Sequence, residues 1–129
     1  PAQPDQARAL LQHALRALPR RKHVRTVVRF ARLEYRSGDA ERGSTMMEGL
    51  VSTHPKRLDL WTIFLDLETS RLKRATAPHL IEQQRQAVRS LYERVCHLSM
   101  SLKKMKYVFK RYVQFEQQYG DSASTQRVR

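Results

Sequence analysis

The sequence predicts an all-α fold, arranged as an antiparallel helix-pair solenoid. Gly and Pro are scarce, with four and five copies among 129 residues, while residues that favour helices are abundant. No lasting alternation of apolar and polar residues indicates a strand, and no Asn-Gly or Asp-Gly pair indicates a hairpin. The third observation is an internal repeat of one helical pattern, and stacked helical repeats are what build a solenoid.

The first repeated pattern is an amphipathic helix with a carboxylate on its apolar stripe. Apolar or aromatic residues and a final Glu stand at i, i+3, i+4 and i+7, which is the spacing of one helix face. Three segments carry the pattern: Val27, Phe30, Ala31 and Glu34; Trp61, Phe64, Leu65 and Glu68; Phe109, Tyr112, Val113 and Glu116. We interpret these aromatic residues as solenoid core rather than as base-stacking platforms. Tyr35 and Tyr107 lie off the stripe and are expected to be exposed.

The Glu on each stripe needs a partner, because burying a charge is unfavourable unless it is paired and hydrogen-bonded. Since the Glu recurs, we interpret it as a packing device and not as a catalytic group. We expect each one to meet an Arg, Lys or Tyr from the other helix of its own pair or from the next repeat. Such a pair fixes the register of the helices more than it stabilises them.

A second type of helix alternates with the first, and its three copies align on Leu11, Met47 and Tyr92. Tyr92 joins the repeat-packing residues. The separation of Glu34 and Glu68, 34 residues, is a period of helix–turn–helix solenoids. The predicted units are residues 5–19, the second helix of a preceding repeat; 22–54, a repeat; 56–100, a repeat with an insertion at about 70–85; and 103–129, the start of a further repeat.

The insertion and the turns complete the predicted order of elements. The insertion adds about eleven residues around Pro78, as a longer loop or as an extended helix followed by a turn. Gly38 and Asp39 are predicted to end one helix and cap the next. Gly120 and Asp121 repeat this signal, and Pro19 and Pro55 follow the second-type helices. We expect the natural solenoid to extend beyond both ends.

The charge balance indicates a polyanionic partner. Lys and Arg number 25 against 12 Asp and Glu, which gives a net charge of +13. Nucleic acid is the first expectation and a membrane surface the second, with a merely solvated basic surface as the alternative.

The single cysteine, Cys96, excludes an internal disulfide and fits a reducing compartment such as cytosol or nucleus. We expect Cys96 to be a small core residue. The sequence offers no zinc spacing, phosphate loop or nucleophile–base set, so no cofactor and no enzymatic activity are expected.

Cations concentrate where each second-type helix leads into the next first-type helix. All such turns lie along one edge of a solenoid, so a basic ladder is predicted there. Its members are Arg20, Arg21, Lys22, Lys56, Arg57, Lys103, Lys104 and Lys106. Helix dipoles explain little of this concentration of cations. Positive charge is favourable at the C-terminus of the helix before each turn but unfavourable at the N-terminus of the helix after it, so the two effects roughly offset. RNA phosphate is the favoured ligand, with acidic protein left open. Arg71, Lys73 and Arg74 form a smaller cluster in the insertion, either solvated or a second contact.

The motifs "WTIFLDLE" and "LYERV" resemble those of the half-a-TPR (HAT) repeat, a TPR-like helix pair. Longer stretches, such as "STHPKRLDLWTIFLDLE", resemble the C-terminal HAT segment of the programmed cell death protein eleven family. Members of that family are large ribosome-biogenesis factors that also carry S1 RNA-binding repeats. The resemblance runs from about residue 5 to residue 121. Gly43 and Gly49, like the insertion, depart from the pattern.

The resemblance implies a non-enzymatic scaffold of the small-subunit processome, located in the nucleolus. Its implied partners are precursor rRNA or small nucleolar RNA and ribosome assembly factors, with no small-molecule substrate. Two alternatives stay open: a protein-only TPR-like adaptor, and a HAT scaffold of the splicing or mRNA 3′-end processing machinery.

Overall fold

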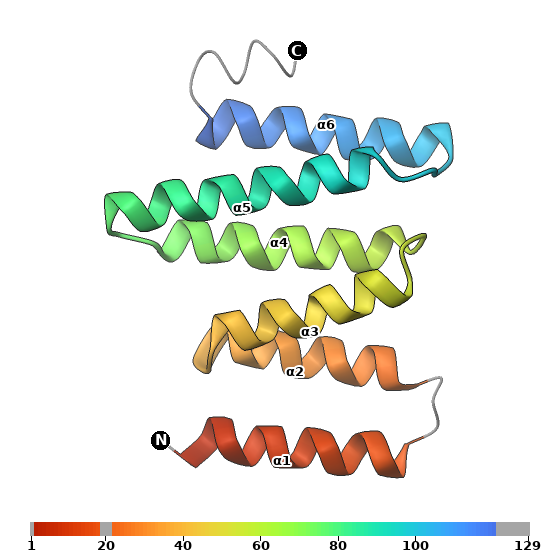
Figure 1. Cartoon of the computed structure of the whole chain (residues 1–129), viewed down its shortest axis with the longest axis vertical. Coiled ribbons are helices and arrows are strands. Elements are labelled where there is room, and N and C mark those ends of the chain that lie inside the picture. The colour runs from red at the N-terminus through yellow and green to blue at the C-terminus, as the bar shows by residue number, and fades with distance from the viewer. Residues whose placement is uncertain (1, 19–21, 121–129) are drawn as a thin grey trace. The chain divides into compact units, whose positions relative to one another are not determined.

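Six helices make up the part of the chain that the computed structural model describes, residues 2–18 and 22–120 (Figure 1). They are α1 (Ala2–Ala17), α2 (His23–Ser37), α3 (Ala40–Thr53), α4 (Leu58–Arg74), α5 (Pro78–Cys96) and α6 (Leu102–Tyr119). No strand occurs within these residues. The prediction of an all-α fold built from helix pairs is confirmed.

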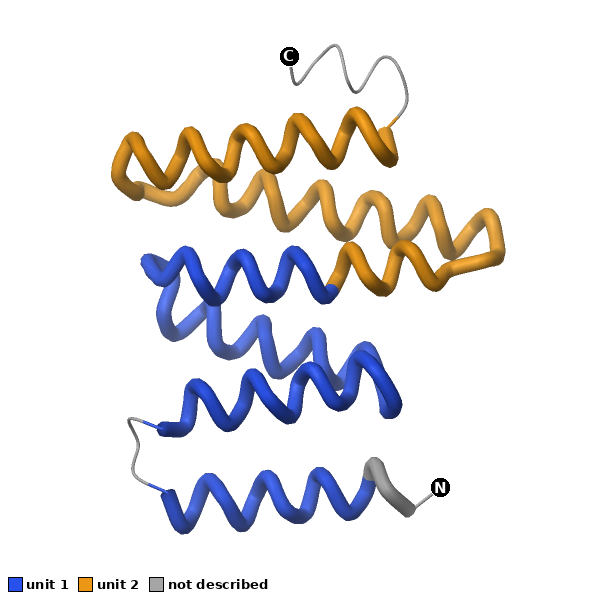
Figure 2. The backbone as a smooth tube through the Cα atoms, turned by 180° about the vertical axis from the view of Figure 1, so that it is seen from behind, with its two compact units in different colours: residues 1–67 blue, residues 68–129 orange. Residues whose placement is uncertain are grey.

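The chain divides into two compact units inside α4 (Figure 2). Unit 1 covers residues 1–67, with α1, α2, α3 and the first part of α4. Unit 2 covers residues 68–129, with the end of α4, α5 and α6. Consecutive helices within each unit run antiparallel, as the short turns between them require (Figure 1).

The insertion lengthens both helices on either side of one short turn. α4 has 17 residues and α5 has 19, whereas α2 and α3 have 15 and 14. Pro78 is the first residue of α5, a position where its missing N–H and fixed φ are tolerated. Of the two possibilities that the sequence left open, the structure shows the extended helix.

Turn residues end the helices largely where the sequence predicts. The Asp39 side chain accepts hydrogen bonds from the backbone N–H groups of Glu41 and Arg42 and so caps α3. Gly38 and Gly120 are the C-cap residues of α2 and α6, and α3 ends at Thr53, just before Pro55. The predicted roles of Pro19 and Asp121 fall outside the described residues.

The buried stripes of α2 and α6 share two of the four predicted residues each, and the other two positions shift to a sequence neighbour or to the adjacent turn. α2 buries Val28, Ala31, Glu34 and Tyr35, and α6 buries Val108, Tyr112, Phe115 and Glu116. Val27, Phe30 and Val113 are only partly buried. The prediction of Phe109 as core is wrong, because its side chain is 49% exposed. In α4, by contrast, Trp61, Phe64, Leu65 and Glu68 are all buried as predicted.

Tyr35 is buried, not exposed, because Gly43 lets α3 approach α2 closely. A Cβ at Gly43 would stand 2.7 Å from Cδ2 of Tyr35 and 3.0 Å from the carbonyl oxygen of Ala31. Gly43 is therefore required by packing, and the Tyr35 prediction is wrong. A Cβ at Gly49, on the same helix, would have no atom within 4 Å, so packing places no demand for glycine there.

Candidate functional site

Glu34 joins three helices of unit 1. Its side chain accepts hydrogen bonds from Arg8 of α1, from Nε at 2.9 Å and Nη2 at 3.3 Å. It also accepts the backbone N–H of Asp39 at 3.2 Å, and Arg42 of α3 lies 3.6 Å away. Arg42 is the cation expected from the paired helix. The closer partner, Arg8, comes from the preceding helix, which the sequence did not predict.

Glu116 repeats this arrangement in unit 2. Arg89 of α5 donates from Nε at 2.7 Å and from Nη2 at 3.1 Å, one bond to each carboxylate oxygen. Glu116 is 1% exposed. Arg8 and Arg89 occupy equivalent positions, each three residues before the aligned Leu11 and Tyr92. A two-pronged guanidinium contact of this kind fixes direction as well as distance.

Glu68 has a different set of partners. Gln84 of α5 donates to its side chain at 3.1 Å and to its backbone carbonyl at 2.9 Å, and Arg71 lies 3.8 Å away. The α3 residue equivalent to Arg8 and Arg89 is Ser44, which has no guanidinium to offer. Where the arginine of the preceding helix is replaced by Ser44, the Glu is bound instead by Gln84 of the following helix, α5. Arg71, expected in a basic cluster, takes part in this internal contact.

The side chains of Glu34 and Glu116 each occupy the space next to the glycine that follows four residues later in the sequence, Gly38 and Gly120. A Cβ at Gly38 would stand 2.1 Å from Oε1 of Glu34, and one at Gly120 would stand 2.2 Å from Oε2 of Glu116. Neither glycine has a positive φ. Close contacts, and not the backbone angle, favour glycine at the ends of α2 and α6. At Gly120 the carbonyl oxygen of Glu116 adds to them, since it would lie 2.7 Å from a Cβ.

An aromatic cluster packs beside Glu116. The rings of Tyr92 and Tyr112 are stacked, with centroids 5.0 Å apart, and Phe115 lies 5.6 Å from Tyr92. The Tyr112 hydroxyl donates to Oε1 of Glu93 at 2.7 Å. Burial, together with the Glu93 carboxylate, raises the pKa of Tyr112 well above its usual range. These rings are packed against each other, as the sequence interpretation of core aromatics expects for Tyr92 and Tyr112.

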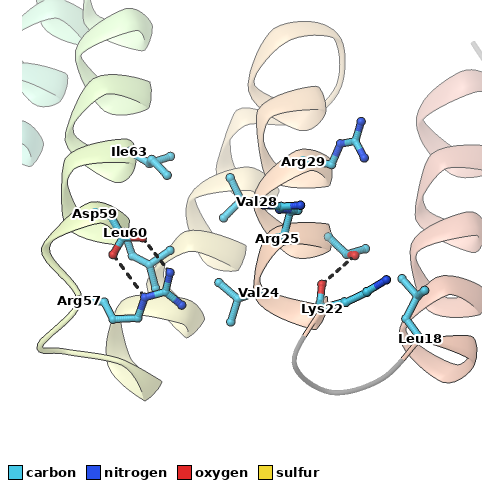
Figure 3. A pocket seen from close by; sticks show the side chains of 11 residues that line it. Leu18, Lys22, Val24, Arg25, Val28, Arg29, Arg57, Asp59, Leu60 and Ile63 are labelled. Carbon is cyan, nitrogen blue, oxygen red and sulfur yellow. Dashed lines mark hydrogen bonds and ion pairs between the residues drawn. The ribbon is translucent and has the colours of Figure 1, made fainter.

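Basic residues of unit 1 surround a groove of about 780 Å³ between α2 and the start of α4 (Figure 3). Lys22 and Arg57, both members of the predicted ladder, line it together with Arg25 and Arg29. Lys56 is exposed next to Arg57. Arg20 and Arg21 fall outside the described residues.

Basic residues of unit 2 gather on one face of α6. Lys103 and Lys104 are exposed near its start, and Lys110 is exposed further along. Between them Tyr107 is 48% exposed, as predicted, and the Arg111 guanidinium carbon lies 5.9 Å from its ring centre. We call Lys103, Lys104, Tyr107, Lys110 and Arg111 the α6 basic face. Lys106 instead borders a groove of about 400 Å³ with Phe109 and Cys96. One edge joining the cations of both units stays a prediction.

Cys96 is partly buried beside this smaller groove, and burial raises the pKa of its thiol. Within the described residues, no group of three or more His, Cys, Asp or Glu side chains can hold a metal ion. None of the helices described is both long enough and apolar enough to cross a membrane.

Comparison with known protein families identifies the family of this chain. The family described as "PRP39 N-terminal HAT repeat" matches residues 5–128. The chain belongs to this HAT-repeat family. The helix pairs are therefore those of a HAT array.

Three relatives of this HAT chain show the wider similarity. It is 41% identical over 120 residues to mouse "Protein RRP5 homolog", covering 93% of this chain and 6% of the relative. It is 37% identical over 125 residues to "rRNA biogenesis protein rrp5" of Schizosaccharomyces pombe, covering 97% and 7%. It is 36% identical over 121 residues to "rRNA biogenesis protein RRP5" of Arabidopsis thaliana, covering 94% and 6%. The chain thus spans a small part of each relative's length.

Sequence reasoning missed two groove residues of this HAT array, Arg25 and Arg29. The signal was present, because Arg25, Arg29, Arg32 and Arg36 follow one another at helical spacing and all four are exposed. The predicted basic ladder contains only residues at the turns or close to them, whereas these four arginines lie within a helix.

Proposed function

We propose that this HAT array is a non-enzymatic scaffold in ribosome biogenesis, acting in the processing of precursor rRNA. The observation that carries the proposal is the similarity, over nearly the whole chain, to proteins named for rRNA biogenesis in fission yeast and Arabidopsis. A net charge of +13 suits a protein that works beside RNA.

The α6 basic face is the proposed RNA contact. Lys103, Lys104, Lys110 and Arg111 surround an exposed Tyr107 ring on one helix. Cations attract the phosphate backbone, and an exposed aromatic ring offers a surface on which an unpaired base stacks. Arg111 already lies near the ring, where it can contact the same nucleotide. This combination favours single-stranded RNA over duplex RNA, whose bases are already stacked.

The complex, the cellular location and the partners are inferred more finely from the family resemblance. We infer work in the small-subunit processome within the nucleolus, with precursor rRNA or small nucleolar RNA and ribosome assembly factors as partners. We also infer a position in the C-terminal part of a larger chain. These inferences rest on the family resemblance described above.

RNA crosslinking in growing cells tests the proposed function. The full-length protein is crosslinked, purified under denaturing conditions, and its bound RNA is sequenced. Enrichment of precursor rRNA or small nucleolar RNA is the expected result. Enrichment of spliceosomal or messenger RNA would instead assign the array to the splicing or 3′-end machinery. Recovery of no RNA above background would favour the protein-only adaptor.

The α6 basic face is tested separately, with fluorescently labelled oligouridylate and the purified chain. Loss of the ring in Tyr107→Ala is expected to weaken binding by about 1–3 kcal/mol, the contribution of one stacked base. Tyr107→Phe keeps the ring and is expected to bind like the wild type. Equal affinity of all three proteins would show that no base stacks on Tyr107.

A further inference from the structure

We propose that the groove of unit 1 binds a short acidic, amphipathic segment of a partner protein. The groove, called here the α2–α4 groove, is lined by side chains from α2, from the start of α4 and from the residues next to them (Figure 3). All of its lining residues belong to unit 1. The RNA contact proposed for α6 belongs to unit 2, so the two proposals stand on different residues.

The rim of the α2–α4 groove is strongly basic. Lys22, Arg25, Arg29 and Arg57 line it, and Asp59 is the single carboxylate among its lining residues. Asp59 is already engaged, because Arg57 donates to it at 2.7 Å and 3.3 Å. Arg25 and Arg29 have no ion pair with any carboxylate in residues 5–18 and 22–120. Those two guanidinium groups are therefore available for an anionic ligand.

The floor of the groove is aliphatic. Val24 and Val28 of α2 face Leu60 and Ile63 of α4 across it, and Leu18, next to the end of α1, also lines the groove (Figure 3). Among these lining residues there is no aromatic ring. Unpaired RNA bases bind proteins by stacking on aromatic side chains, which this groove lacks. An aliphatic floor adds no binding energy for the phosphate groups. A peptide that carries Leu, Ile or Val beside Asp or Glu matches both the floor and the rim.

The spacing of the two available arginines suits such a peptide. Arg25 and Arg29 are one helical turn apart, so their Cα atoms are separated by about 6 Å along the axis. Carboxylates at i and i+2 of an extended peptide are about 6.6 Å apart, and those at i and i+4 of a helix about 6 Å. Either form places two carboxylates opposite the two guanidinium groups. In the extended form the alternate side chains point to the other face of the peptide, so apolar ones there are free to meet the aliphatic residues of the groove.

Binding of a designed probe to the purified chain tests the proposal. The probe is a fluorescein-labelled peptide of three Asp-Leu-Glu-Val units, followed by fluorescence anisotropy. A second probe with Ser in place of Leu and Val keeps the charge and removes the apolar side chains. Labelled oligouridylate is the RNA probe. The apolar acidic probe is expected to bind at least about tenfold more tightly than the Ser probe, and oligouridylate is expected not to displace it from the groove.

Two charge-reversed variants of α2 provide a matched comparison. Arg25→Glu/Arg29→Glu changes the groove, whereas Arg32→Glu/Arg36→Glu makes the same change of charge on exposed residues outside its lining. The first is expected to weaken binding of the apolar acidic probe about tenfold or more, and the second less than about threefold. Ile63→Ser, which leaves the charge unchanged, is expected to weaken the apolar probe selectively. Circular dichroism checks that each variant keeps its helices.

Three results would overturn the proposal. Equal losses in the two arginine variants would mean that the probe senses only overall charge. Equal affinity for the Leu/Val and Ser probes would remove any role for the aliphatic floor. Oligouridylate that displaces the peptide and loses affinity only in Arg25→Glu/Arg29→Glu would make RNA the occupant. None of these outcomes bears on Tyr107, so the proposed RNA contact of α6 is judged independently.

Discussion

At the scale of single residues, the buried Glu–Arg pairs fix how neighbouring helices meet. Arg89 and Glu116 make two short hydrogen bonds in a nearly dry site, with the Glu 1% exposed. A buried ion pair adds little net stability compared with apolar residues, but removal of one partner leaves an uncompensated charge. The pair therefore opposes any slip of α6 along α5, because a slip would separate the two groups.

Arg89→Ala is expected to lower the free energy of unfolding by about 3–5 kcal/mol. The reason is that the Glu116 carboxylate stays buried without its guanidinium. Arg57→Ala is the control, since Arg57 and Asp59 form an equally short but exposed pair. Its loss is expected to cost at most about 1 kcal/mol. Urea denaturation measures both variants, and similar small losses would show that Glu116 is adequately solvated without Arg89.

Ionisation of the Tyr112 hydroxyl is expected to make the free energy of unfolding depend on pH in the alkaline range. The pKa of this hydroxyl is raised by burial first and then by Glu93, so the native state keeps the proton after the unfolded state has lost it. The free energy of unfolding therefore has its full value below about pH 10, where an unfolded Tyr is protonated, and falls as the pH rises above that value.

Tyr112→Phe isolates this effect, because it keeps the ring that stacks on Tyr92 and removes the titrating group. Between about pH 9 and pH 11, urea denaturation is expected to show a steeper loss of stability in the wild type than in the variant. Parallel curves for the two proteins would mean that the hydroxyl ionises as readily in the native state as in the unfolded state.

At the scale of helices, glycines decide how closely two of them approach. Gly43 faces the Tyr35 ring and the Ala31 carbonyl, and its missing side chain allows α3 to pack on α2. Gly49, six residues later on the same helix, faces open space. The two glycines share a helix and a residue type, but only one of them is required by its surroundings.

Gly43→Ala and Gly49→Ala are expected to change stability in opposite directions. The first forces a methyl group against the Tyr35 ring and a backbone oxygen, and is expected to lower the free energy of unfolding by about 1–3 kcal/mol. The second removes a flexible residue from an exposed helical position and is expected to raise it by about 0.5–1 kcal/mol. Thermal unfolding followed by circular dichroism measures both. A stabilising Gly43→Ala would mean that α2 and α3 can move apart without loss.

At the scale of the whole chain, the excess of positive charge is spread over surfaces of different character. The α6 basic face in unit 2 surrounds an exposed aromatic ring, whereas the α2–α4 groove in unit 1 has an aliphatic floor. The first combination suits RNA and the second suits an acidic peptide. If both proposals hold, the RNA and the acidic peptide contact different residues of the chain.

The dependence of RNA affinity on salt distinguishes the two surfaces. Lys103→Gln/Lys104→Gln is expected to reduce the slope of log K against log salt concentration for oligouridylate by about 1.4, which corresponds to two lost phosphate contacts. Arg25→Gln/Arg29→Gln removes the same charge from the groove and is expected to change the slope by less than half as much. Titrations at several salt concentrations measure both slopes. Equal changes would indicate one continuous RNA-binding surface.

The repeat itself could be predicted from the sequence, because each helix carries its own signal. Glu34, Glu68 and Glu116 recur with apolar residues at helical spacing, and Asp39 marks the start of a helix by chemistry that is local to the turn. The burial of all three glutamates follows from their position on these stripes. The sequence also identified Tyr107 as an exposed ring.

The sequence by itself determined the all-α fold, the alternation of two helix types and the need of each buried Glu for a partner. Tertiary structure alone decided which neighbouring apolar stripe is buried, since Val27 and Val28 are equally apolar and only packing against other helices separates them. It also decided that Arg8 and Arg89 meet the glutamates, that Gly43 admits Tyr35, and that Arg25 and Arg29 border a groove. Local signals depend on a few adjacent residues, whereas a contact between helices depends on how two separate segments pack, and periodicity within one helix carries no information about its neighbour.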